Sequence, residues 1–136
     1  MCLAQWRGGT RLVRRFNLVQ IICEFLVKEG ARQKFVLVFG PGGVWSSLFS
    51  NAPGFWGTIL LCDEDNSSRY LVIETWKSIA QRKQFLDDHA DACLELDDRL
   101  AQLIEHKTDL GVFRVLAEAT VRPRNPRRVP LGGWYR

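Results

Sequence analysis

Two ionisable side chains in this sequence lie among apolar residues, and each could take a proton from a substrate. The first is His89, which belongs to a row of residues spaced by three or four: Leu86, His89, Cys93, Leu96, Leu100 and Leu103. Because the pKa of histidine is near neutrality, His89 could remove a proton from a phenol or a hydroxyquinone. The alternative is a structural histidine in the core or at a helix junction, hydrogen-bonded to the backbone.

The second candidate is Glu74, a carboxylate within the apolar run VIETW. If this run is a strand, Glu74 shares one face with Tyr70, Val72 and Trp76. A buried glutamate can act as a general base, because burial raises its pKa. It can equally be a structural group that pairs with Arg114 or Lys28 on another strand, and Glu24 presents the same choice.

Aromatic side chains near these two residues are candidates for the wall of a pocket. They could stack on a flat substrate, although aromatic residues at such positions also form ordinary core. Cys23 could be a nucleophile only if a neighbouring base lowered its pKa, and none is adjacent in sequence. The predicted lining consists of Trp76, Trp56, Phe85, Cys23 and Phe35.

No metal site is expected, because the four cysteines, at positions 2, 23, 62 and 93, lack the spacing of metal ligands. The GPGG motif at 40–43 lacks the Lys-Ser or Lys-Thr ending of a phosphate-binding loop and follows a predicted helix. We therefore expect neither a metal nor a phosphate site.

Four strands and two helical regions must position these side chains. Apolar, β-branched or aromatic runs predict strands at 18–27, 55–62, 70–76 and 112–116. Helical spacing predicts a helix from Ala31 to Phe39, stopped by GPGG, and a short turn at 44–49. A long helix follows the N-cap Ser78 and continues to Thr108, with a kink or break at the DDHAD motif.

The order β, α, β, β, α, β is that of the ferredoxin-like fold, an α+β fold with a four-stranded antiparallel sheet and both helices on one face. The strands are apolar on both faces, yet the helices cover only one. An uncovered apolar face needs a partner, and the simplest one is a second copy related by a twofold axis. We therefore predict a homodimer through the sheet faces, a dimeric α/β barrel.

Three motifs in this framework carry a resemblance to a known family: VKEG at 27–30, PGFWGTILL at 53–61 and YLVIETWKS at 70–78. The chain resembles the antibiotic biosynthesis monooxygenase (ABM) family of dimeric α/β barrels over about residues 18–116. The resemblance implies a pocket between sheet and helices. It also implies either cofactor-free oxygenation of phenols or quinols, haem degradation, or an activity that has not been defined.

The haem-degrading branch is tested by its own site residues. Those enzymes use an asparagine, a tryptophan and an iron-ligating histidine at positions that correspond here to Cys23, Phe85 and Glu95. None matches, so we do not expect haem degradation.

The charge distribution argues against a nucleic-acid module. Residues 17–116 carry ten Lys/Arg against fourteen Asp/Glu, so the basic excess lies in the two ends. A nucleic-acid-binding domain carries its basic residues on the folded face. We predict a basic arm at 1–16, one domain at 17–118, and a disordered Arg- and Pro-rich tail at 119–136. No run is apolar enough to span a membrane, and a cytoplasmic location is expected.

The sequence thus predicts a monooxygenase-like homodimer that acts without a cofactor on a small planar aromatic or quinol. In that hypothesis His89 or Glu74 accepts the proton. The alternative is a non-catalytic small-molecule-binding or stress-related barrel. A third possibility is a structural dimer whose Arg-rich ends recruit an acidic partner.

Overall fold

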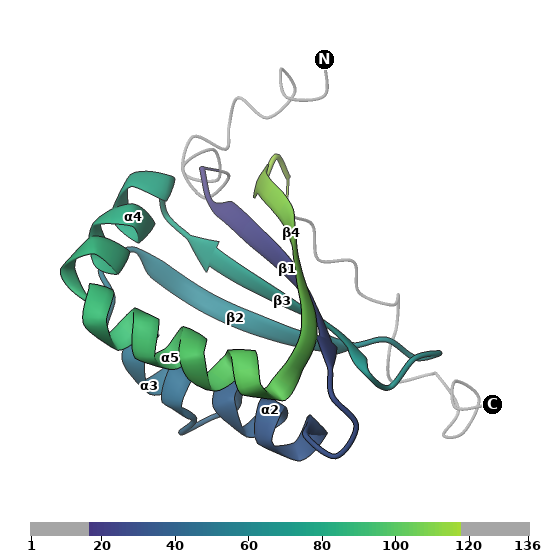
Figure 1. The fold of residues 1–136 in the computed structure, drawn as a ribbon. Helices are drawn as coiled ribbons and strands as arrows, with labels where there is room; N and C mark the ends of the chain where they lie inside the picture. The colour runs from purple at the N-terminus through teal and green to yellow at the C-terminus, as the bar shows by residue number, and fades with distance from the viewer. Residues whose placement is uncertain (1–16, 118–136) are drawn as a thin grey trace, which may run out of the picture.

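The computed structural model describes residues 17–117, which form one antiparallel sheet with helices on one of its faces (Figure 1). The sheet has four strands in the order β2-β3-β1-β4. This is the predicted ferredoxin-like arrangement. The elements in chain order are β1 (Val19–Val27), α2 (Arg32–Phe39), α3 (Val44–Phe49), β2 (Phe55–Cys62), β3 (Arg69–Trp76), α4 (Ile79–Asp88), α5 (Ala90–Leu103) and β4 (Ile104–Arg114).

Strand β3 shows why these residues form a half-covered sheet. Its residues alternate between buried and partly buried positions along the whole strand. The buried set, which faces the helices, is Tyr70, Val72, Glu74 and Trp76, as the period-two pattern predicted. Strand β3 is central, with β2 on one side and β1 on the other. The candidate base Glu74 is therefore held in the middle of the sheet, under the helices.

The second helical region is split as predicted. Ser78 caps α4, because its Oγ accepts a hydrogen bond from the Gln81 backbone N–H at 3.1 Å. The helix ends at Asp88, and His89 has the non-helical dihedrals φ −120° and ψ 34° before α5 begins. The break lies within DDHAD, where aspartates compete for backbone hydrogen bonds.

The predicted end of the second helix and start of the last strand are wrong. We expected helix up to Thr108 and a strand at 112–116, but α5 stops at Leu103 and β4 occupies Ile104–Arg114. Strand β4 lies at the edge of the sheet, where side chains reach water on both faces, and this explains its polar residues. A bulge lies at Leu110, because Gly111 pairs with Ile22 and Asp109 pairs with the next residue, Cys23, so Leu110 is left without a partner on β1. Gly111 has φ 123°, which favours glycine.

The core between sheet and helices is mostly aromatic. Phe35 and Trp76 are fully buried, and Trp45 stacks on Phe49 with ring centroids 4.0 Å apart. Phe25 on β1 contacts Phe35 on α2 at 5.3 Å. These contacts join α2 and α3 to the sheet.

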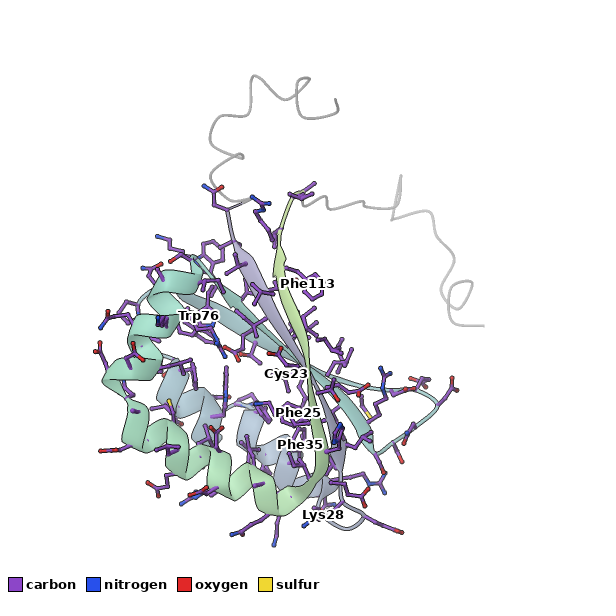
Figure 2. All side chains as sticks on the ribbon, turned by 45° about the horizontal axis from the view of Figure 1, so that its top comes forward. Cys23, Phe25, Lys28, Phe35, Trp76 and Phe113 are labelled. Atoms are coloured by element: carbon purple, nitrogen blue, oxygen red, sulfur yellow. The ribbon has the colours of Figure 1, made fainter. Side chains whose placement is uncertain are left out.

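The other face of the sheet carries no helix among residues 17–117 (Figure 1). Phe113 projects from β4 on this side, away from the helices (Figure 2). Polar contacts are interspersed: Arg69 pairs with Glu24, and Gln20 donates to Thr75 at 3.3 Å. Strand register places seven apolar side chains here: Ile22, Leu26, Ile59, Leu61, Leu71, Ile73 and Phe113.

The two ends, 1–16 and 118–136, lie outside the described residues. The predicted basic arm and the predicted disordered tail therefore stay predictions.

Candidate functional site

A cavity of about 150 Å³ lies between the sheet and the helices. Its floor comes from β1 and β3, and its remaining walls come from the helices and β4. Eight apolar side chains line it: Phe25, Phe39, Trp45, Phe49, Val72, Leu86, Leu96 and Leu100. Apolar cavities of about this volume take up benzene in other proteins. The space therefore suits a ligand the size of one aromatic ring.

The buried carboxylate in the lining of the cavity is that of Glu74, which is 7% exposed. Its Oε1 accepts hydrogen bonds from Trp76 Nε1 at 2.9 Å and from Arg82 Nε at 3.0 Å. Arg82, on the second turn of α4, also reaches Oε2 at 3.4 Å. A buried carboxylate is tolerated when it is paired in this way. The Glu74–Arg82 pair therefore joins β3 to α4 at one end of the cavity.

Two cysteines line the same cavity, Cys23 from β1 and Cys93 from α5. Burial raises the pKa of both thiols, although Lys107 and Arg82 act in the opposite direction on Cys23. Both thiols are therefore neutral at physiological pH and serve as small apolar wall groups. Figure 2 shows Cys23 on the sheet, in line with Phe25 further along the strand.

The sequence profile of the antibiotic biosynthesis monooxygenase family matches residues 19–94, more than half of the chain. The chain belongs to the antibiotic biosynthesis monooxygenase family. The match covers β1 to the first part of α5, which contains all of the cavity residues except Leu96, Asp97, Leu100 and Lys107. No curated protein sequence matches the chain significantly.

Several solved structures share the fold of this chain. A variant of SnoaB, a cofactor-independent oxygenase from Streptomyces nogalater, is 24% identical, with a TM-score of 0.61, and the alignment covers 81% of this chain and 98% of that one. A conserved protein from Methanosarcina mazei is 16% identical (TM-score 0.59), covering 74% and 95%. A protein from Mycobacterium tuberculosis is also 16% identical (TM-score 0.55), covering 76% and 99%. At these identities the likeness concerns the fold.

His89 lies outside the lining of the cavity. Its side chain is exposed at the junction of α4 and α5, where the ring stacks on Phe85 at 4.3 Å. Its Nδ1 is 3.1 Å from the Phe85 carbonyl oxygen. This is the backbone-bonded junction histidine that sequence analysis named as the alternative. The row of three- and four-residue steps placed His89 on the inner face, but the helix break at this residue turns it outward.

The predicted pocket residues separate into three groups. Cys23 and Glu74 line the cavity. Trp76, Phe85 and Phe35 are buried in the surrounding core and do not reach it. Trp56 is 55% exposed and lies at a groove beside the uncovered sheet face. Of the five residues predicted to line the pocket, only Cys23 lines this cavity, and none of the four aromatic ones does. Strand and helix positions, which decide which rings face the gap, set this outcome.

The cavity also contains residues that sequence analysis missed. Arg82, not Arg114 or Lys28, is the partner of Glu74. The sequence did contain a signal for Arg82: it stands three residues before the apolar Phe85, and this spacing puts both side chains on the same side of a helix. Lys107 had no such signal, because its segment was predicted to be helix.

Other types of site find less support in the part of the chain that the structure describes. Residues 17–117 contain no group of three His, Cys, Asp or Glu side chains arranged to hold a metal ion. None of the helices between these limits has the length and apolarity of a membrane span.

Proposed function

We propose that this protein binds a phenol or hydroquinone of about one ring in the cavity under α5 and promotes its oxygenation by dioxygen. The observation that carries the proposal is the combination of a ring-sized apolar cavity and one buried carboxylate at its end. Family membership supports the oxygenase chemistry. The size of the cavity supports a single ring over a larger polycyclic substrate.

In the proposed reaction Glu74 accepts the phenolic proton. The resulting anion gives one electron to dioxygen, and the two radicals combine to a hydroperoxide on the ring. Loss of water then leaves one oxygen atom on the ring, so hydroquinone and dioxygen give hydroxyquinone and water. The Arg82 guanidinium next to Glu74 stabilises the negative charge that forms on substrate and oxygen. No electron donor other than the substrate is needed.

Oxygen uptake tests this proposal directly. We expect the full chain to consume dioxygen with hydroquinone faster than heat-denatured protein does, and added catalase to return no oxygen, because water and not hydrogen peroxide is formed. Mass spectrometry with labelled dioxygen should find one labelled oxygen atom in the product. Uptake no faster than in the denatured control, for hydroquinone and its methylated analogues, contradicts the oxygenase proposal.

The second candidate function is a binding module without catalysis. The observation that favours it is that Oε1 of Glu74 already accepts two hydrogen bonds, from Trp76 and from Arg82. A carboxylate held in this way also serves as a structural link. In that case ring-sized phenols bind in the cavity, and oxygen uptake stays at the background rate.

We propose further that the protein is a homodimer through the uncovered face of the sheet. Ile59 and Phe113 on this face are 51% and 49% exposed in the single chain. Burying such a face against a second copy removes apolar surface from water, which stabilises the assembly.

A reducing location such as the cytoplasm suits the free thiols of Cys23, Cys62 and Cys93.

Sedimentation tests the dimer. We expect wild type to sediment as a dimer and Ile59→Lys to sediment as a folded monomer, because a charge on the apolar face opposes its burial. Leu94→Lys is the matched control, since Leu94 is 62% exposed on α5 and lies on the opposite side of the molecule. A folded wild-type monomer at high protein concentration contradicts the proposal.

A further inference from the structure

Two of the residues that line the cavity are exposed to solvent, Asp97 and Lys107. All the others are buried or partly buried. Asp97 comes from α5 and Lys107 from β4, the strand that continues directly from the end of α5 (Figure 1). Because these are the lining residues that reach solvent, we place the mouth of the cavity between these two side chains of opposite charge.

The ammonium group of Lys107 is directed at the cavity wall. Its Nζ lies 5.6 Å from the ring centroid of Phe25, a buried residue that also lines the cavity. A cation at this distance is attracted by the face of the ring. None of the ion pairs among residues 17–117 includes Lys107. Lys107 thus offers its charge to the cavity, and no carboxylate of the described residues forms an ion pair with it.

Lys107 and Glu74 lie at opposite ends of the cavity. Lys107 on β4 is opposite Phe25, whereas Glu74 on β3 is opposite Ile21. Two strand spacings and four residues along β1 separate their Cα atoms by about 16 Å. Cys23 lies between them on β1, and the charges of both residues affect its pKa. One phenolic oxygen is too small to contact both ends, so a ligand that uses both carries two polar groups.

We infer that the ligand is a phenol or hydroquinone with a carboxylate on the side opposite the phenolic group, and that Lys107 selects this carboxylate. The inference rests on the proposed function, because it places the phenolic oxygen at Glu74. Lys107 is a specificity-determining residue in this scheme, and the proton transfer stays at Glu74. The carboxylate of Asp97, at the same mouth, repels an anionic ligand and so reduces the preference for the carboxylate over a neutral group.

A matched pair of ligands tests this inference: 4-hydroxybenzoate, with a carboxylate, and 4-hydroxybenzamide, with a neutral amide of the same shape. Isothermal titration with the full chain should find the acid bound about fivefold more tightly than the amide, as expected for a partly exposed ion pair. Lys107→Met should remove this preference, and Lys107→Arg should keep it. Asp97→Asn should increase it, while affinity for the amide stays constant in all variants.

The possible failures are distinguishable. If the amide binds and the acid binds no more tightly, or if Lys107→Met still binds the acid more tightly than the amide, the role of Lys107 is overturned. The proposal of a ring-binding cavity is unaffected by either result. If neither compound binds and hydroquinone is not oxidised, the proposed function fails and the inference fails with it. Because Lys107 is an exposed residue of an edge strand, its substitutions should leave the fold intact. An unchanged melting temperature verifies this for each variant.

Discussion

Glu74→Gln is expected to lower kcat for hydroquinone oxygenation by at least about 100-fold, because removal of a general base has an effect of this size. Glutamine keeps the shape of the side chain, and its oxygen still accepts the hydrogen bonds from Trp76 and Arg82. It cannot take the phenolic proton at neutral pH. The affinity for a ring-sized phenol measured without oxygen should therefore change little while turnover falls.

Two control variants make this result specific. Glu95→Gln removes a carboxylate from the exposed pair with Arg99, where the two atoms are 3.9 Å apart, and should leave the rate unchanged. His89→Ala removes the competing candidate base, which lies outside the cavity lining. A rate lost with His89→Ala and kept with Glu74→Gln contradicts the assignment of Glu74 and transfers the role to His89.

Trp76→Ala is expected to destabilise the fold by about 3–5 kcal/mol, the usual cost of removing a large aromatic side chain from a core. Trp76 is fully buried and its ring contacts Phe55 at 5.3 Å. Trp76→Phe should cost less, about 1–3 kcal/mol, because the phenyl ring still fills part of the space of the indole. The remaining cost arises because Glu74 loses a buried hydrogen-bond donor. The midpoint of urea denaturation measures both changes.

The hydrogen bond can be separated from packing by a double-mutant cycle. If Trp76 stabilises the protein partly through Glu74, the effects of Trp76→Phe and Glu74→Leu should be coupled by about 1 kcal/mol. Leu94→Ala, at an exposed position of α5, is the control for general effects of truncation and should change stability by less than about 0.5 kcal/mol. A coupling near zero contradicts a stabilising role for the Trp76–Glu74 contact.

The sheet could be predicted from sequence where one local signal dominates. The period-two alternation of β3 fixes which side chains face the helices, and Glu74 belongs to that set. Strand β4 lacks this signal, because an edge strand exposes polar residues on both faces and its bulge at Leu110 interrupts the alternation. Its segment therefore resembled the end of a helix.

The cavity could be predicted only in part, because it depends on the relative positions of distant elements. Glu74 was found from its place in an apolar strand, but its partner Arg82 comes from the next helix across a turn. His89 illustrates the reverse error: its spacing fits the inner face of a continuous helix, and one non-helical residue is enough to turn it to solvent. Packing between elements, which no local pattern records, decides such cases.

The most direct test is a crystal structure of the protein soaked in 4-bromophenol, whose bromine is located by its anomalous signal. The ring should lie between Phe25 and Leu100, with its hydroxyl group within hydrogen-bonding distance of Glu74 and its bromine towards the mouth at Lys107. An empty cavity, with bromine only in the groove beside Trp56 on the uncovered sheet face, would contradict the account.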